Sequence, residues 1–188
     1  MNKAELRKQE MIRRHALSKE QQALLNEKLL YQFTTLDFAQ VQVLHLFLPI
    51  AEKNEPDTFM LIRWLKEYHP DIQILVPRAD FKTNLMTHHP YKGEEDLQKN
   101  LFNILEPVQD EMHTGKIDLV IVPLLAFDNL GYRVGYGKGF YDRFLQNLDT
   151  LKVGISFFEG VDSIADTHAD DVRLDLCITP EKIVRFTL

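Results

Sequence analysis

Five short runs of mainly apolar residues recur along the chain. They are VQVLHLFLP (41–49), IQILVP (72–77), DLVIVPLLAF (118–127), KVGISFF (152–158) and LDLCIT (174–179). A nearly continuous apolar run is typical of a strand that is covered on both faces, as in a parallel sheet. We therefore predict five buried strands.

The stretches between these runs carry the signals of helices. Capping boxes mark two helix starts, at Asn2 with Glu5 and at Ser18 with Gln21. Apolar stripes at helical spacing follow in two segments: Leu25, Leu29 and Phe33 in the first, and Phe59, Ile62 and Leu65 in the second. Further helices are predicted over 57–68 and 138–148. Alternating strands and helices predict an α/β fold, and we expect one domain over 1–188 with a mainly parallel sheet between helices on both faces.

Composition narrows the function classes. The formal net charge of −6 argues against a nonspecific nucleic-acid binder. The single cysteine, Cys177, allows no internal disulfide and fits a reducing compartment. No apolar run approaches the roughly 20 residues of a membrane span, and the first residues are too charged for a secretory signal. We expect a cytoplasmic protein with neither nucleic acid nor membrane as a partner.

One segment concentrates unusual chemistry. GYRVGYGKGFYDR (131–143) holds four of the eight glycines and lies between a predicted strand and a predicted helix. Such a loop offers backbone N–H groups, and Lys138 and Arg133 add cations, so the segment suits a phosphate. Its G-x-G-x-G spacing matches neither the Walker A loop nor the dinucleotide fingerprint. A sharp glycine turn with an incidental lysine is the alternative.

The same segment carries a family resemblance. DLVIVPLLAFD followed by GYRVGYGKGFYDRFL (118–145) closely resembles the signature of the 5-formyltetrahydrofolate cyclo-ligase family, also called methenyltetrahydrofolate synthetases. KAELR (3–7), FLPIAEKNEPDT (47–58) and DDVRLD (170–175) resemble further family segments, so the likeness spans nearly the whole chain. It implies a fold related to the ribose-5-phosphate isomerase and glucosamine-6-phosphate deaminase group. It also implies a ligase of folate one-carbon metabolism that uses ATP and Mg²⁺ to convert 5-formyltetrahydrofolate into 5,10-methenyltetrahydrofolate, releasing ADP and phosphate.

The resemblance implies a set of site residues. Contacts to ATP are implied for Lys3, Arg7, Arg133, Val134, Gly135, Tyr136, Gly137, Lys138, Gly139, Phe140 and Tyr141. Contacts to the folate substrate are implied for Leu48, Glu55, Tyr136, Gly137, Lys138, Gly139 and Phe140. Lys138 and Arg133 would stabilise charge during phosphoryl transfer. Phe140 departs from the tyrosine that is more frequent there, so a phenolic hydrogen bond is lost while a ring remains.

Two carboxylates are implied as magnesium ligands, Asp142 and Asp171, because Mg²⁺ prefers carboxylate and phosphate oxygens. Each has an alternative. Asp142 could serve only as an acidic residue in the first turn of a helix, and Asp170 lies beside Asp171. The folate carboxylate also has a rival, because Glu52 would take the place of Glu55 if the register of this loop slipped.

Other residues have plainer interpretations. Cys177, His45 and Trp64 are predicted to be packing residues, with the histidine hydrogen-bonded, and His88 and His89 are predicted at the surface or a strand edge. A noncatalytic folate- or nucleotide-binding protein on the same fold is the alternative to the ligase, and a small-molecule phosphotransferase is a weaker third. The expected partners are ATP and 5-formyltetrahydrofolate, with or without a polyglutamate tail, and the expected state is a monomer.

Overall fold

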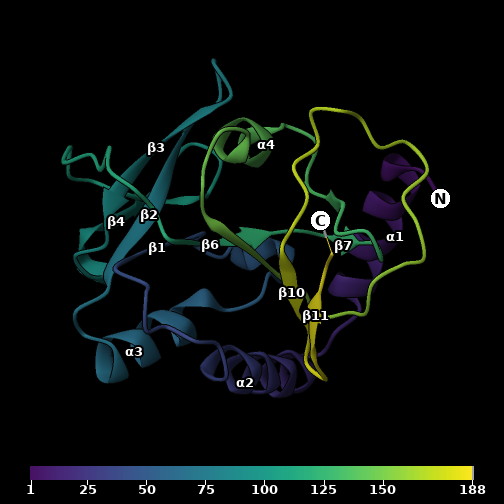
Figure 1. Ribbon diagram of the computed structural model, residues 1–188, viewed down its shortest axis with the longest axis horizontal. Helices are drawn as coiled ribbons and strands as arrows, with labels where there is room; N and C mark the ends of the chain where they lie inside the picture. Colours follow the sequence, from purple (N-terminus) through teal and green to yellow (C-terminus); the bar gives the residue numbers. More distant parts are fainter. Residues whose placement is uncertain (188) are drawn as a thin grey trace.

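The computed structural model describes residues 1–187 and has a seven-stranded central sheet (Figure 1). Its strands, in spatial order, are β11 (Ile183–Arg185), β10 (Leu176–Ile178), β9 (Leu151–Ile155), β6 (Leu119–Pro123), β1 (Val43–Leu46), β2 (Gln73–Asp80) and β3 (Leu85–Pro90). The five inner strands pair in parallel. The edge strands β3 and β11 are antiparallel to their neighbours. The predicted mixed α/β fold with a mainly parallel sheet is therefore confirmed.

Four α-helices accompany the sheet in the described part of the chain: α1 (Lys3–His15), α2 (Lys19–Thr34), α3 (Thr58–Tyr68) and α4 (Phe140–Leu145). Both predicted capping boxes are present, at Asn2 and at Ser18. Asp57 caps α3 by accepting a hydrogen bond from the Phe59 N–H at 3.0 Å. These local signals determined where the first three helices begin.

The two faces of the sheet are covered differently. Leu44 and Leu46 of β1 pack with Phe33 of α2 and Leu65 of α3 in the larger apolar cluster. Leu145 of α4 packs on the opposite face in a smaller cluster built on β6, β10 and the segment between β9 and β10. Helix α1 lies apart from both and packs through Leu6 on a small antiparallel hairpin, β7 (Ala126–Phe127) with β8 (Arg133–Val134). That hairpin leads directly into the glycine-rich segment 135–139, which we call the glycine loop.

The largest departures from the predicted elements lie around this loop. The predicted strand 118–127 is split, because the chain leaves the sheet after Pro123 and pairs with β8 as β7. The predicted helix 138–148 is reduced to Phe140–Leu145, since Gly139 takes a left-handed conformation (φ 70°) just before it. Five strands lie outside the predicted apolar runs: β3, β4 (Leu97–Lys99), β5 (Leu105–Pro107), β8 and β11.

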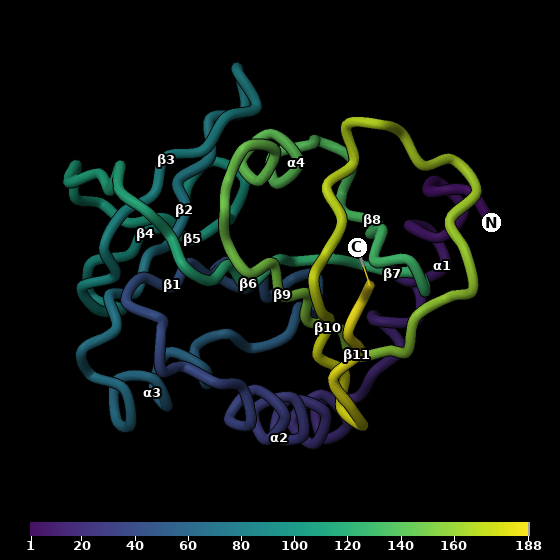
Figure 2. Tube along the Cα trace, in the orientation of Figure 1, coloured from purple at the N-terminus to yellow at the C-terminus, as the bar shows by residue number. Residues whose placement is uncertain are grey.

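The start of the chain is held by a segment that is distant in the sequence. Figure 2 shows the segment between β9 and β10, drawn in yellow-green, running alongside the N-terminal helix α1. The Ala165 N–H donates to the Met1 carbonyl at 3.0 Å, and the Lys3 N–H donates to Asp166 Oδ1 at 2.6 Å. The start of α1 is therefore anchored by a segment about 165 residues away in the sequence.

The predicted packing residues are mostly confirmed. Cys177 is buried, and Trp64 packs among the rings of Phe33 and Phe38. His45 is fully buried on the α4 side of β1, but neither of its ring nitrogens has a hydrogen-bond partner among the described residues. The prediction that His45 is hydrogen-bonded was therefore wrong. Within residues 1–187, no helix combines the length and apolar character that crossing a membrane would need.

Candidate active site

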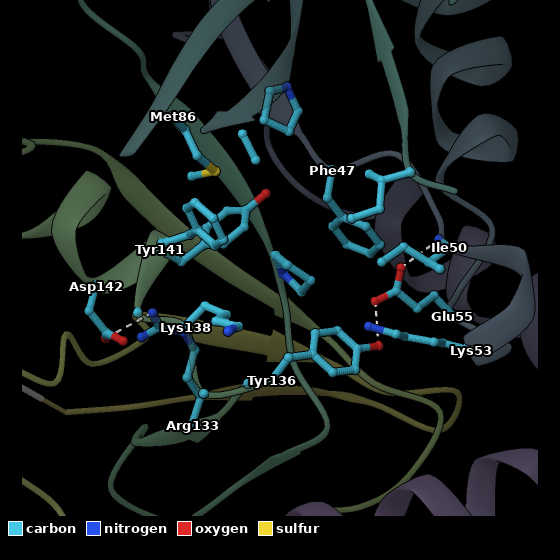
Figure 3. A pocket seen from close by; sticks show the side chains of 18 of the residues that line it. Phe47, Ile50, Lys53, Glu55, Met86, Arg133, Tyr136, Lys138, Tyr141 and Asp142 are labelled. Atoms are coloured by element: carbon cyan, nitrogen blue, oxygen red, sulfur yellow. Dashed lines mark hydrogen bonds and ion pairs between the residues drawn. The ribbon is translucent and has the colours of Figure 1, made fainter. Parts of the chain in front are cut away.

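A cavity of about 770 Å³ opens at the carboxyl ends of β1, β2 and β6, where open α/β sheets bind their ligands. Figure 3 shows side chains from several segments pointing into it. Its lining includes the predicted residues Lys3, Arg7, Leu48, Glu55, Arg133, Gly135, Tyr136, Gly137, Lys138, Gly139, Phe140, Tyr141, Asp142 and Asp171. Only Val134 of the predicted set lies outside the lining, because its buried side chain packs with Leu6.

The glycine loop is shaped by backbone requirements. Gly137 (φ 90°) and Gly139 (φ 70°) take left-handed conformations that other residues rarely adopt. A Cβ on Gly137 would stand 3.2 Å from the Arg7 guanidinium. Arg7 Nε in turn donates to the Gly135 carbonyl at 2.9 Å. Helix α1 therefore holds the loop in place through Arg7, and the close approach that glycine permits here is to a side chain of the protein itself.

Lys138 stands at the exposed tip of the loop. Its backbone carbonyl accepts a hydrogen bond from Arg143 at 2.8 Å. Among residues 1–187, no carboxylate forms an ion pair with its ammonium group. The side chain lines the cavity. Lys138 is thus available to an anionic ligand without first breaking a contact with the protein.

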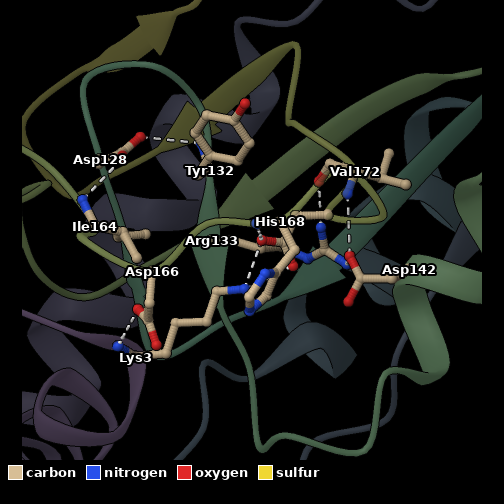
Figure 4. Close-up of polar contacts among 10 residues, drawn as sticks. Lys3, Asp128, Tyr132, Arg133, Asp142, Ile164, Asp166, His168 and Val172 are labelled. Carbon is tan, nitrogen blue, oxygen red and sulfur yellow. Dashed lines mark hydrogen bonds and ion pairs between the residues drawn. The ribbon is translucent and has the colours of Figure 1, made fainter.

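Arg133 and Asp142 form an ion pair at the same end of the cavity (Figure 4). Arg133 Nη2 lies 2.9 Å from Asp142 Oδ1, and Nη1 donates to the Val172 carbonyl. The Val172 N–H donates to the same Asp142 oxygen at 3.1 Å. One carboxylate oxygen of Asp142 is therefore used twice within the protein, while no protein contact is found for Oδ2 in the described chain.

Lys3 and Asp171 form a second ion pair beside the first. Lys3 Nζ donates to Asp171 Oδ1 at 2.7 Å, and the His168 N–H donates to Oδ2 at 2.7 Å. Burial by itself raises the pKa of the Asp171 carboxyl, but these hydrogen bonds and the Lys3 charge together hold that pKa below its usual range. Lys3, which is predicted to bind ATP, thus neutralises Asp171, which is predicted to bind the metal.

Glu55 lies at the other end of the cavity, where Figure 3 shows it beside Tyr136 and Lys53. Its side chain is 9% exposed. Oε1 accepts the Tyr136 hydroxyl at 2.6 Å and Oε2 accepts the Ile50 N–H at 2.7 Å. Burial raises the pKa of the Glu55 carboxyl, and these two hydrogen bonds oppose that rise. A buried carboxylate with one donor on each oxygen keeps further lone pairs for a ligand.

Glu52, the rival carboxylate, lies elsewhere. It is exposed in the short helix η1 (Ala51–Lys53) and forms an ion pair with Lys99 at 3.1 Å. It does not line the cavity. The loop register chosen from the sequence therefore brings Glu55, and not Glu52, to the cavity.

The model of the 5-formyltetrahydrofolate cyclo-ligase family matches residues 1–180. The chain belongs to this family.

Individual relatives agree with the family match. The 5-formyltetrahydrofolate cyclo-ligase of Escherichia coli K12 is 30% identical over 180 residues, which cover 91% of this chain and 96% of that protein. The enzyme of the same name from Mycoplasma pneumoniae is 34% identical over 189 residues, covering 96% and 100%. The NMR structure of Aquifex aeolicus 5,10-methenyltetrahydrofolate synthetase matches with a TM-score of 0.84 at 30% identity, covering 100% of this chain and 94% of the other. The predicted family is confirmed.

In this cyclo-ligase family member, an apolar wall joins the two ends of the cavity. It is built from Phe47, Leu48, Phe81, Met86, Leu105, Phe140 and Tyr141. Phe140 meets the Phe81 ring edge-on, with the ring centroids 5.3 Å apart. The Tyr141 hydroxyl is buried without a partner among the described residues, and burial followed by the nearby Glu55 charge raises its pKa. The wall suits a flat, partly aromatic ligand with few polar groups.

Sequence reasoning missed several lining residues. Met86 lies on β3 and Leu105 on β5, two strands that no apolar run predicted. Lys53 places its ammonium 3.8 Å from the centroid of the Tyr136 ring. Its position two residues before Glu55 could have suggested this contact, because short loops present neighbouring side chains to the same site.

Proposed function

We propose that this protein catalyses the ATP- and Mg²⁺-dependent cyclisation of 5-formyltetrahydrofolate to 5,10-methenyltetrahydrofolate, with release of ADP and phosphate. The observation that carries the proposal is one cavity with a cation-rich end, containing Lys3, Arg7, Arg133 and Lys138, and a buried carboxylate, Glu55, at the other. Nucleotide phosphates suit the first end, and a heterocycle with adjacent N–H donors suits the second.

The chemistry of the substrate explains why both ends are needed. A formamide oxygen is a poor leaving group, and the arylamine N10 is a weak nucleophile. Transfer of the γ-phosphoryl group to the formyl oxygen allows N10 to attack the formyl carbon and expel phosphate. Such a transfer depends on positioning and on neutralising charge. We assign Lys138 to the charge on the transferred phosphoryl group, since it is exposed in the cavity and no ion pair within the described residues holds it.

Arg133 has a more constrained part in this scheme. Its guanidinium is 5% exposed and is already bonded to Asp142 and to the Val172 carbonyl. Arg133 would therefore stabilise the phosphoryl charge in one of two ways. Its guanidinium would stay bonded to Asp142 and act over a short distance, or it would exchange Asp142 for the phosphoryl group when the ligand binds. Lys3 and Arg7 complete the nucleotide side of the proposal, together with the backbone of residues 133–141.

Asp142 and Asp171 would hold the magnesium ion. No cluster of three or more potential protein ligands is found within residues 1–187. Magnesium needs no such cluster, because it commonly binds one or two carboxylates together with substrate phosphates and water. Asp142 bonds to the N–H of Val172, the residue after Asp171, so the two carboxylate-bearing segments are adjacent. Asp142 and Asp171 would hold the ion there, and it would supply positive charge that offsets the charge of the phosphates.

Glu55 would recognise the pterin ring of the folate. The ring offers the N3–H and the 2-amino group side by side, and a carboxylate can accept both bonds in one plane. The hydrogen bonds from Tyr136 and Ile50 fix the carboxylate on its protein side. Leu48 and the wall ring Phe140 would contact the folate.

A spectrum tests the proposal. Protein, ATP, Mg²⁺ and 5-formyltetrahydrofolate are mixed, and the near-ultraviolet band of methenyltetrahydrofolate is followed over time. The band should grow only when all four are present. Binding of folate and ATP by calorimetry without any growth of the band would instead support the alternative, a noncatalytic binding protein on this fold.

Other expectations accompany this function. We expect a single domain over 1–188, a monomer, a cytoplasmic location and substrates with or without a polyglutamate tail. We also expect the fold to be related to the ribose-5-phosphate isomerase and glucosamine-6-phosphate deaminase group. The mainly parallel sheet with its site at the carboxyl ends of the strands supports that relation.

A further inference from the structure

Arg14, near the end of α1, is among the largest fully buried side chains of the protein, at 2% exposure. It does not line the cavity. A guanidinium is always charged at physiological pH and is costly to bury without partners. Its contacts therefore need an explanation.

Those contacts lead to the Glu55 end of the cavity. Arg14 Nη2 donates to the Leu124 carbonyl at 2.7 Å, which anchors the guanidinium to the chain just after β6. Nη1 donates to the Tyr136 hydroxyl oxygen at 3.2 Å. The Tyr136 hydroxyl donates in turn to Glu55 Oε1 at 2.6 Å. Three segments, α1, the glycine loop and the loop before α3, are thus joined in one chain of hydrogen bonds.

Arg14 determines the direction of both hydrogen bonds, from Arg14 to Tyr136 and from Tyr136 to Glu55. An arginine can only donate, so the Tyr136 oxygen accepts on that side. The tyrosine has one hydroxyl proton, and that proton is then directed to Glu55. A buried cation at one end and a carboxylate at the other favour each other electrostatically, since screening by water is weak inside the protein.

We propose that Arg14 is a positioning residue for folate recognition. Acting through Tyr136, it directs the tyrosine hydroxyl proton toward Glu55 Oε1. The hydrogen bond from Tyr136 in turn holds the Glu55 carboxylate ionised and oriented toward the cavity. The proposal rests on the proposed function, in which Glu55 binds the pterin donors. Arg14 has no direct access to the substrate. It lies on α1, the helix whose first turn faces the proposed nucleotide site.

The ionisable surroundings of Glu55 define the expected pH effect. Tyr136, Arg14 and Lys53 face it from the glycine loop, α1 and η1, and the Tyr141 hydroxyl is close enough for the Glu55 charge to act on it. Burial raises the Glu55 pKa, and Arg14 and Lys53 lower it. Loss of Arg14 should therefore raise that pKa further, so that folate binding weakens at a higher pH than in the native protein.

The test compares the pH dependence of the folate KM in the native protein and in Arg14→Gln. The variant should raise the folate KM about tenfold at pH 7, with kcat at saturating folate and the ATP KM nearly unchanged. The rise in KM on acidification should begin at a higher pH than in the native protein. Arg14→Lys, which keeps the charge, should restore the native pH profile in part. A profile identical to the native one in Arg14→Gln would overturn the proposal.

Two further variants separate positioning from general stability. Arg13→Gln is the matched control, because Arg13 is half-exposed and its guanidinium lies over the Phe158 ring at 3.9 Å; its KM and pH profile should stay native. Tyr136→Phe breaks the hydrogen-bonded chain at the cavity surface. It removes one acceptor of Arg14, whose guanidinium stays anchored to the Leu124 carbonyl. In a Tyr136→Phe background, Arg14→Gln should raise the folate KM little further. If the effects of the two substitutions on the folate KM were fully additive as free energies, Arg14 would not act through Tyr136.

A ligand-free measurement distinguishes failure of this inference from failure of the proposed function. The Glu55 carboxyl carbon is followed by ¹³C NMR during a pH titration of the native protein, Arg14→Gln and Tyr136→Phe. Its midpoint should move to higher pH in both variants. If the native protein does not turn over 5-formyltetrahydrofolate, only the proposed function is refuted. If the midpoint of the Glu55 titration is the same in the variants as in the native protein, the role of Arg14 is refuted whatever the activity.

Discussion

The two ends of the cavity are organised on opposite principles. At the charged end, defined by Lys3, Arg7, Arg133, Lys138, Asp142 and Asp171, ion pairs neutralise both acidic side chains, Lys3 with Asp171 and Arg133 with Asp142. At the Glu55 end, a single buried carboxylate is oriented by Tyr136 and Ile50 within apolar surroundings. With four cations and two carboxylates, the charged end keeps a net charge of +2 and can exchange its ion-pair partners, whereas the Glu55 carboxylate is already held by hydrogen bonds within the protein.

This difference assigns each end its part in the proposed reaction. A triphosphate with a divalent ion brings opposite charges that can replace the two protein ion pairs with little net change in charge. A fixed carboxylate loses little conformational entropy on binding and therefore suits recognition. Changes at the charged end should thus act on catalysis and on the metal requirement, and changes at the Glu55 end should act on folate affinity.

The largest effect should follow removal of the divalent ion. A chelator in excess should abolish turnover, and added Mg²⁺ should restore it, because phosphoryl transfer needs its charge neutralised. Initial rates of the methenyl band, measured before and after the addition, check this. Full activity in the presence of chelator would mean that no divalent ion takes part at the charged end.

Lys138→Ala should lower kcat by roughly 10²–10³, since loss of one donor to developing charge typically costs about 2.7–4 kcal/mol. The melting temperature should change little, because the side chain forms no ion pair with the described residues and lies at an exposed loop tip. Lys8→Ala on the exposed side of α1 is the control and should stay active. Near-native kcat in folded Lys138→Ala would mean that the loop lysine is incidental.

Glu55→Ala should raise the folate KM about ten- to a hundredfold and leave the ATP KM nearly unchanged, because hydrogen bonds to a charged group contribute roughly 1.5–3 kcal/mol each. Glu52→Ala should change neither constant, since its partner is the surface residue Lys99. Steady-state kinetics with each substrate varied separately provide the measurement. Loss of folate affinity in the Glu52 variant alone would contradict the assignment of the Glu55 end.

Asp142→Asn should raise the Mg²⁺ concentration needed for half-maximal rate several-fold, on the order of 1 kcal/mol of metal affinity. An amide can still accept from Arg133 and Val172 through its oxygen, so the fold around the loop should persist. A magnesium titration of the rate checks this. An unchanged titration would leave Asp142 as a structural partner of Arg133 and nothing more.

The expected effect that bears least on activity is one on stability, from two histidines beneath the apolar wall. His45 and His88 have ring centroids 4.9 Å apart. Burial lowers the pKa of both rings, and neighbouring histidines lower each further: His88 acts on His45, while His89 and His113 act on His88, whose pKa falls to about 4. A depressed histidine pKa means that the unfolded state binds more protons, so stability is full above about pH 6.5 and falls as pH drops toward 4. Each titrating group can remove up to about 1.4 kcal/mol per pH unit over that window.

Urea unfolding at pH 7 and pH 5 measures this loss, and His88→Leu should reduce it. Equal losses in the native protein and the variant would mean that His88 does not contribute. The charged end should be insensitive to the substitution, so kcat at pH 7 should stay near the native value.

Local sequence patterns determined much of this protein. The capping boxes at Asn2 and Ser18 begin α1 and α2, because their hydrogen bonds involve residues only three positions apart. The apolar runs placed the five inner strands, since burial on both faces requires apolar residues throughout. The glycine loop carried the family resemblance that implied roles for Lys138 and Asp142, and the separate segment 47–58 implied the role of Glu55.

Only the tertiary structure decided how these parts meet. The contacts of Lys3 with Asp171 and of Arg14 with Tyr136 join residues 168 and 122 positions apart, which no short window relates. The order of strands in the sheet brings α1 against both the glycine loop and the segment before β10. A sequence records periodicity and caps because these act between near neighbours. Ion pairs and hydrogen bonds between distant side chains depend on where the whole sheet carries them, so the ion pairs of the charged end and the placement of Arg14 behind Glu55 became visible only in three dimensions.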